Sequence, residues 1–126
     1  MMLITSKGTR RWVLPKGGIK PGRKCFESAA DEAFEEAGIT GQMSRNCIGI
    51  YGYQKSDKKY GVHCTVRVYP MKVTAMLPDW PERNERRREW VAFEVASSRV
   101  REKDLKKMIR SFHSSLKGRR SAAKAR

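Results

Sequence analysis

Residues 17–39 read GGIKPGRKCFESAADEAFEEAGI, a glycine-rich loop that runs into a patterned helix. Between Cys25 and Ala37 the apolar residues recur three and four positions apart, which predicts a helix with one apolar stripe. The stripe consists of Phe26, Ala29, Ala30, Ala33, Phe34 and Ala37. Gly38 follows at the position where helices commonly end in the left-handed conformation. The many alanines predict close packing of this helix against a sheet.

Three carboxylates lie beside that stripe. Glu32, Glu35 and Glu36 are three and four positions apart, so they fall within about one third of the helix circumference. They also lie in the second half of the helix, where the macrodipole disfavours negative charge. Hard divalent cations, chiefly Mg²⁺, relieve such repulsion and bind phosphate oxygens as well. The spacing therefore favours a metal site, with a solvated acidic face as the alternative.

The segment from Gly17 to Ile39 resembles the Nudix box. That pattern runs glycine, five residues, Glu, seven residues, Arg-Glu, an aliphatic, any residue, Glu-Glu, any residue, glycine, an aliphatic. The resemblance implies an α/β fold, specifically a Nudix-type α/β/α sandwich around a mixed central β-sheet. The usual first strand of that sheet is expected to be missing, because the chain opens at the segment that normally follows it.

The same resemblance implies a Nudix hydrolase, which cleaves a diphosphate linked to another group by means of a metal-activated water. It implies that Glu32, Glu35 and Glu36 are the catalytic and metal-binding residues and that Gly17 contributes its carbonyl to the metal. The expected cofactor is Mg²⁺, with Mn²⁺ as an alternative. The general base is left open. Glutamates outside the box that could serve are Glu82, Glu85 and Glu89, for which a charge-dense loop is the simpler interpretation.

Two positions depart from the family pattern. Arg23 stands where the family has its first glutamate, and Asp31 stands where the family has arginine. In the family these two residues are understood to pair and to brace the loop against the helix. Because both charges are reversed here, an Arg23–Asp31 pair would restore the contact in the opposite order. The rival hypothesis is a decayed box in a non-catalytic binder.

The rest of the chain predicts further short strands and two helices within the same single domain. Expected strands are 2–6, 12–14, 48–53, 62–73 and 88–93, with 48–53 and 62–73 forming a hairpin around the polar loop 55–59. Expected helices are 94–98 and 102–116, the second ended by Gly118. The predicted Nudix domain spans residues 1–116, and residues 117–126 are predicted to be a basic, disordered tail.

Composition and charge indicate the class of protein and its expected location in the cell. The 126 residues suit one domain, and the formal net charge of +15 predicts attraction to polyanions. Three widely spaced cysteines without a C-x-x-C pair argue against disulfides and zinc. With neither a membrane-spanning run nor a signal peptide in the sequence, we expect a cytoplasmic protein.

Features outside the box look like the branch that cleaves diphosphoinositol polyphosphates and dinucleoside polyphosphates. They are the segment 5–7, the Leu-Pro-Lys-Gly-Gly segment that precedes the helix, and the segment 86–90. The expected partner is a phosphorylated small-molecule substrate. The candidate substrate-binding residues are Ser6, Lys7, Arg10, Arg11, Lys16 and Gly18.

Alternatives to that substrate class stay open. Removal of pyrophosphate from RNA 5′ ends is one, with nucleic acid held by the basic surface and tail. A non-catalytic binder of polyphosphate or nucleic acid is another. An exposed apolar sheet edge at residues 2–5 would further suggest a homodimer.

Overall fold

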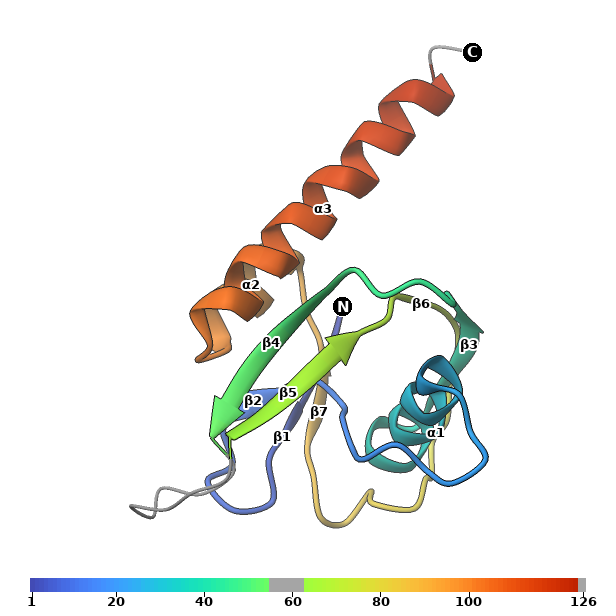
Figure 1. Cartoon of the computed structure of the whole chain (residues 1–126), viewed down its shortest axis with the longest axis vertical. Coiled ribbons are helices and arrows are strands. Elements are labelled where there is room, and N and C mark those ends of the chain that lie inside the picture. Colours follow the sequence, from blue (N-terminus) through green and yellow to red (C-terminus); the bar gives the residue numbers. More distant parts are fainter. Residues whose placement is uncertain (55–62, 125–126) are drawn as a thin grey trace.

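The computed structural model describes residues 1–54 and 63–124. Figure 1 shows strands between a helix on one side and a helical pair on the other. The elements in chain order are β1 (Met2–Thr5), β2 (Trp12–Val13), α1 (Cys25–Ala37), β3 (Ile39–Met43), β4 (Gly49–Gln54), β5 (His63–Val68), β6 (Met71–Met76), β7 (Arg88–Trp90), α2 (Phe93–Arg99) and α3 (Lys103–Lys124). This confirms the α/β Nudix-type sandwich that the sequence predicts.

The described strands pair in four antiparallel ladders that make up three sheets, whereas the expected central sheet was mixed. β1 lies between β2 and β7, β3 pairs with β6, and β4 pairs with β5. The β4–β5 ladder confirms the predicted hairpin, and its loop of residues 55–59 lies outside the described residues. Because β1 is paired on both sides, the prediction of an exposed edge at residues 2–5 is wrong. The homodimer inferred from that edge loses its basis.

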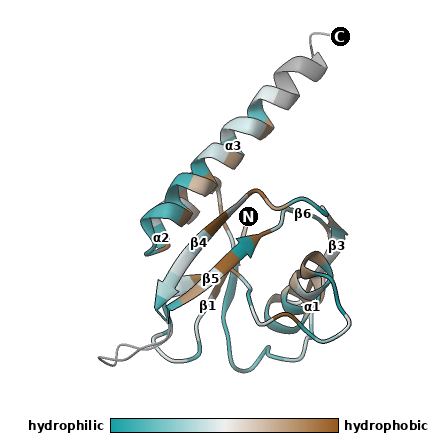
Figure 2. Cartoon of the chain, in the orientation of Figure 1, coloured by the Kyte–Doolittle hydropathy of each residue, from teal (hydrophilic) through white to brown (hydrophobic). Residues whose placement is uncertain are grey.

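The central strand β1 joins two hydrophobic clusters. Leu3 belongs to a cluster with residues of β4, α2 and α3, whereas Met2 and Ile4 belong to a cluster with α1. The alternation follows from the two-residue side-chain period of a strand. Since all four residues of β1 are buried, this strand fixes the position of α1 relative to the rest of the fold. In Figure 2 hydrophobic residues recur along the strands between the helices.

Three sequence predictions of local structure need correction. The expected strand 62–73 is two strands, β5 and β6, because Pro70 lacks the N–H that a continuous ladder needs. α3 continues through Gly118 to Lys124, so the prediction that Gly118 ends it is wrong. The domain boundary at residue 116 falls within this helix, and the division of the chain remains a prediction. The predicted apolar stripe is also partly wrong, because Phe34, which was placed in the stripe, is exposed, while Glu36 on the same helix is buried.

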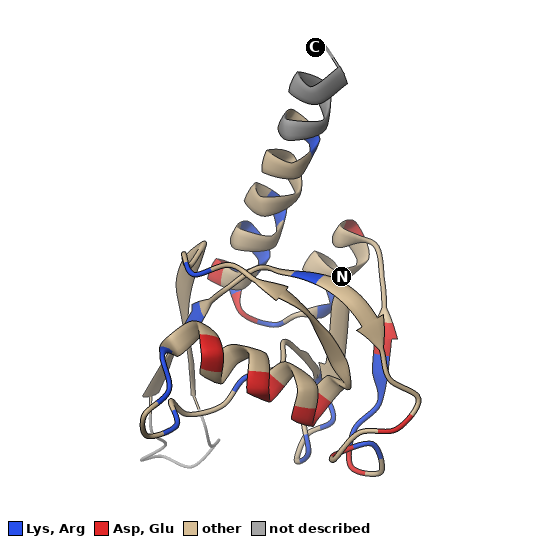
Figure 3. Cartoon of the chain, turned by 90° about the vertical axis from the view of Figure 1, so that its right-hand side faces the viewer, with Lys and Arg blue, Asp and Glu red and all other residues tan. Residues whose placement is uncertain are grey.

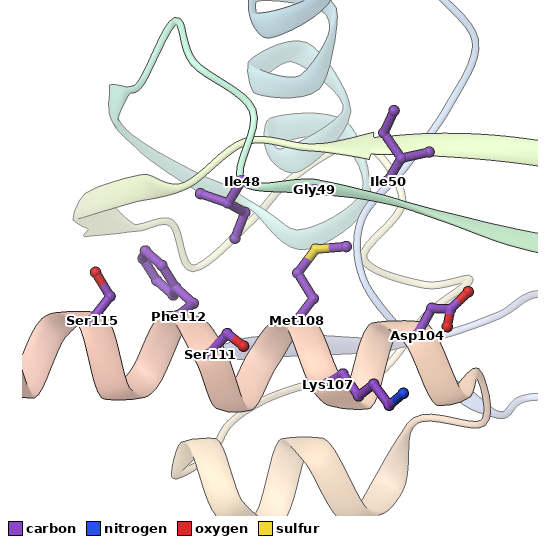
Figure 4. Close-up of a pocket in the computed structure, with 9 residues that line it drawn as sticks. All are labelled: Ile48, Gly49, Ile50, Asp104, Lys107, Met108, Ser111, Phe112 and Ser115. Carbon is purple, nitrogen blue, oxygen red and sulfur yellow. The ribbon is translucent and has the colours of Figure 1, made fainter.

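An open cleft of about 530 Å³ separates α3 from β4 (Figure 4). Met108 extends from α3 toward Gly49, where an added Cβ would come within 2.8 Å of its methyl group. The cleft lies on the α3 side of the strands, away from α1 and its carboxylates. None of the helices in the described part of the chain is both long and apolar enough to cross a membrane.

Candidate active site at the α1 helix

Glu36 is the buried centre of the carboxylate group on α1. Its side chain is almost fully enclosed, with the residue only 2% exposed. Oε2 accepts a hydrogen bond from the Lys16 backbone N–H at 3.2 Å, and Oε1 lies 3.2 Å from Arg86 Nη2. Burial raises the pKa of Glu36 to about 7, although the Arg86 guanidinium acts in the opposite direction. The glycine loop, α1 and the segment before β7 therefore meet at one carboxylate.

Glu32 and Glu35 lie nearer the surface on the same side of α1. A Cβ added to Gly17 would come 2.3 Å from the carboxyl carbon of Glu32, so a larger residue at this position would displace that carboxylate. Burial, followed by the charge of Glu35, raises the pKa of Glu32. Lys20 Nζ lies 2.7 Å from Glu35 Oε1. The predicted glutamates and Gly17 thus come together at one edge of the helix, as the spacing of the box predicts.

The segment between β6 and β7 docks on the C-terminal end of α1. Trp80 Nε1 donates to the Glu36 carbonyl at 3.1 Å, and the Glu82 N–H donates to the Glu35 carbonyl at 3.0 Å. Arg88 Nη1 donates to the Ala37 carbonyl at 2.9 Å, and its guanidinium stacks on Trp80 with Cζ 3.9 Å from the ring centroid. These contacts satisfy carbonyls that the helix end leaves unpaired.

Glu82 is the one of the three glutamates outside the box that joins the site. Its charge acts to raise the pKa of both Glu32 and Glu36, which shows that it is close to them. Burial acts to raise its own pKa, but hydrogen bonds from Arg86 and Lys7 hold the pKa of Glu82 below its ordinary value.

The two other candidate bases lie at the rim of the site or away from it. Glu85 is exposed and pairs with Lys7 at 3.1 Å. Glu89 pairs with Arg99 at 2.9 Å. Arg86 was not singled out as a site residue from the sequence, because nothing distinguishes it within a run of three arginines.

Of the six predicted substrate-binding residues, Lys16 lies nearest Glu36. Its Nζ stands 4.7 Å from the Tyr53 ring centroid, and burial lowers its pKa. Lys16 makes no ion pair with any residue that the structure describes. Lys7 reaches the site indirectly, through its ion pair with Glu82 at 3.1 Å. Gly18 is exposed in the loop beside Gly17.

The remaining three predicted residues, Ser6, Arg10 and Arg11, lie in the turn between β1 and β2. Ser6 Oγ lies 2.9 Å from Thr9 Oγ1 and accepts the Arg11 N–H at 3.2 Å. Arg11 Nη1 donates to both carboxylate oxygens of Glu102, at 2.8 and 3.1 Å. Arg10 is exposed and has a positive φ of 55°. The structure therefore brings Lys16 and Lys7 to the glutamates, while Arg11 is held by Glu102 instead.

Arg23 and Asp31, whose charges are reversed relative to the family pattern, form an ion pair in the structure. Arg23 Nε and Nη2 donate to the two carboxylate oxygens of Asp31, each at 3.1 Å, and Arg23 Nη1 lies 3.4 Å from Glu27. The loop before α1 is thus tied to the helix by a bidentate ion pair. This geometry is the one that the Arg23–Asp31 hypothesis requires.

A double-mutant cycle should detect this pair in the free energy of unfolding. Both side chains are about one third or more exposed, so we expect a coupling of only about 0.5 to 1 kcal/mol between Arg23→Ala and Asp31→Ala. The exchanged variant Arg23→Asp with Asp31→Arg should recover most of that coupling. Urea unfolding of the four proteins of the cycle measures it, and strictly additive effects would contradict the pair.

The side chains around α1 have the oxygen chemistry that hard divalent metal ions prefer, although they are not arranged as a metal site. Figure 3 shows acidic residues recurring along α1 and basic residues on the loop that leads into it. The site supplies only oxygen donors from Glu32, Glu35, Glu36 and Glu82, and Gly17 provides the close backbone approach. Within residues 1–54 and 63–124, no three acidic, His or Cys side chains are arranged to hold a metal ion together. Lys20 and Arg86 instead pair with the carboxylates.

Fold and site define the chain as a Nudix-type domain, and comparison with known proteins agrees. The sequence model of the NUDIX domain matches residues 2–112. The chain belongs to the Nudix family. The Ap4A hydrolase of C. elegans, solved as a binary complex, has a similar fold, with a TM-score of 0.65 at 21% identity, covering 93% of this chain and 85% of that one.

Two curated relatives show where in the family the similarity lies. "Nudix hydrolase 12, mitochondrial" of Arabidopsis thaliana is 29% identical over 117 residues, 89% of this chain and 57% of the relative. "Diphosphoinositol polyphosphate phosphohydrolase 3-beta" of Homo sapiens is 33% identical over 98 residues, 76% of this chain and 56% of the relative. The chain therefore spans little more than half the length of these relatives. The predicted membership of the Nudix family and the predicted similarity to its diphosphoinositol branch are confirmed.

Burial of Glu36 predicts a pH-dependent stability of the metal-free protein. Because the folded-state pKa of about 7 lies above the ordinary 4.5, the folded chain holds this proton more tightly than the unfolded chain between those values. Stability is therefore expected to fall as pH rises through this window, by about 3 kcal/mol at most. Urea unfolding with a chelator at pH 4.5 to 8 measures this, and Glu36→Gln should lose that part of the slope. An unchanged slope in the variant would contradict the assignment.

Proposed function

We propose that this chain is a Mg²⁺-dependent pyrophosphohydrolase whose substrate is a heavily phosphorylated small molecule, either a dinucleoside polyphosphate or a diphosphoinositol polyphosphate. The observation that carries the proposal is the buried Glu36 carboxylate, shared between the glycine loop and Arg86, with Glu32 and Glu35 beside it. The relatives named above support the substrate class.

In this proposal each group at the site has a distinct role. Glu32, Glu35, Glu36 and the Gly17 carbonyl would hold Mg²⁺, which neutralises pyrophosphate charge and lowers the pKa of a bound water. Lys16 presents a half-buried ammonium beside Glu36 that has no ion-pair partner among the described residues, so it can bind a phosphate oxygen.

Arg86 and the adjoining segment complete the arrangement. Arg86 keeps Glu36 and Glu82 in place through contacts of 3.2 and 3.0 Å. Hydrogen bonds from Trp80 and Arg88 to the Glu36 and Ala37 carbonyls anchor the Trp80–Arg88 segment on α1, so that Glu82 is placed beside the box before any substrate arrives. Glu82 thereby adds a fourth carboxylate beside those of the box.

A substrate screen tests the proposal. The panel comprises dinucleoside polyphosphates, diphosphoinositol polyphosphates, nucleoside triphosphates and 5′-triphosphate RNA, each assayed with Mg²⁺ and with a chelator. We expect turnover of one of the first two classes, only with Mg²⁺. Preferred turnover of 5′-triphosphate RNA would favour the nucleic-acid alternative, and tight binding without turnover would show a non-catalytic binder.

A further inference from the structure

Lys20 brings a positive charge to the carboxylates assigned to the metal ion. Its Nζ lies 2.7 Å from Glu35 Oε1 and 3.9 Å from Glu32 Oε1. A monovalent cation of the chain itself thus relieves the repulsion between two of the three box glutamates. This is the same electrostatic task that a divalent ion performs when it binds there.

The backbone around Lys20 is fixed to α1. Its N–H donates to Ser28 Oγ at 3.1 Å, and that hydroxyl is buried in the first turns of the helix. Its carbonyl accepts the Arg23 N–H at 3.1 Å, and Pro21 restricts the chain at the next position. With the backbone held in this way, only the lysine side chain must be ordered for the ammonium to reach Glu35, which lowers the entropic cost of the contact.

We propose that Lys20 is an internal cation that competes with the divalent metal ion for Glu32 and Glu35 and so sets the metal concentration that the protein needs. The inference rests on the proposed function. An ammonium 2.7 Å from Glu35 Oε1 takes one of the acceptor positions of that carboxylate and places a positive charge close to any metal ion that the carboxylate would bind. Metal binding at Glu32 and Glu35 must therefore either overcome the repulsion from Lys20 or displace it from Glu35, and either cost lowers the affinity for the metal ion.

Lys24 provides a matched control. It lies in the same short basic segment before α1 and is exposed, but it forms no ion pair within the described part of the chain. Replacing Lys24 by methionine removes one positive charge from the same loop. It leaves the Lys20 contact with the carboxylates in place, so the general effect of a lost charge can be separated from direct competition.

The test is a MgCl₂ titration of the thermal unfolding of the full chain, carried out on wild type, Lys20→Met, Lys20→Arg, Lys24→Met and Glu35→Gln. A metal ion that binds only the folded chain raises the midpoint temperature of unfolding, and the dependence of that midpoint on MgCl₂ gives the half-saturating Mg²⁺ concentration. For Lys20→Met we expect a half-saturating concentration about threefold to tenfold lower than wild type. Lys20→Arg and Lys24→Met should stay close to wild type, and Glu35→Gln should need more Mg²⁺.

Two other outcomes would overturn the inference, each in a distinguishable way. If Mg²⁺ stabilises wild type but Lys20→Met has an equal or higher half-saturating concentration, Lys20 does not compete, and the proposed function stands. If Mg²⁺ stabilises neither wild type nor Lys20→Met, the metal site fails and takes the proposed function with it. Titration of Mn²⁺ followed by its electron paramagnetic resonance signal gives the same comparison without unfolding the variants.

Discussion

Replacing Arg88 by alanine is expected to lower the free energy of unfolding by about 3 to 4 kcal/mol. The guanidinium donates to the carbonyls of Ala37, Gly38 and Leu77 at 2.9, 3.3 and 2.7 Å. It also covers the Trp80 ring. Hydrogen bonds from a charged donor are each stabilising by roughly 1.5 to 3 kcal/mol, and the truncated side chain leaves partly buried carbonyls without a donor.

The neighbouring arginine is the matched control for this variant. Arg87 is exposed, and the hydrogen bond from this residue to Thr5 uses its backbone N–H, so Arg87→Ala should stay within about 0.5 kcal/mol of wild type. Arg88→Lys should recover only part of the loss, since an ammonium cannot reproduce the planar fork. Urea unfolding in a chelator measures all three, and equal stabilities for Arg87→Ala and Arg88→Ala would contradict the role of Arg88.

Replacing Glu36 by glutamine is expected to lower turnover by about 10³-fold, within the range found for a positioned acid or base. Glutamine keeps the shape of the side chain but removes the negative charge that the site offers to the metal ion. Glu36 is only 2% exposed, so water cannot readily replace its carboxylate. Steady-state turnover of the substrate found in the screen measures the loss.

This loss should come without unfolding. Burial of the charged carboxylate opposes folding above the pKa of Glu36, so Glu36→Gln should be at least as stable as wild type at pH 8 in the absence of metal. Glu27→Gln is the matched control, because Glu27 lies in the first turn of the same helix and pairs with Arg23. It should change turnover by less than about twofold, and a comparable loss in both variants would contradict a special role for Glu36.

The helix and its site were predictable from the sequence because the information is local. Box spacing predicts that Glu32, Glu35 and Glu36 share one side of α1, and Gly38 ends the helix at a φ of 63° as expected. Which edge of the helix is buried was not predictable from that spacing. Periodicity predicts Phe34 in the stripe, but the packing of α1 on β1 and β3 buries Glu36 and leaves Phe34 exposed.

Contacts between distant segments could not be read from the sequence. Arg86 and Trp80 reach Glu36 across 50 and 44 positions, and nothing near either residue in the sequence indicates that contact. The same holds for Arg11, whose partner Glu102 lies 91 positions away. Nucleic-acid binding, the cytoplasmic location and the choice of metal ion remain predictions.

The measurement that tests the central claim most directly is the rate of pyrophosphate-bond cleavage as a function of Mg²⁺ concentration, with wild type beside Glu32→Gln. We predict a rate that rises from zero to saturation in wild type and is restored by Mg²⁺ after chelation. Glu32→Gln should need more Mg²⁺ and should reach a lower maximum, because it loses the carboxylate held against Gly17. Cleavage that persists in a chelator, or a Glu32→Gln curve identical to wild type, would contradict the account.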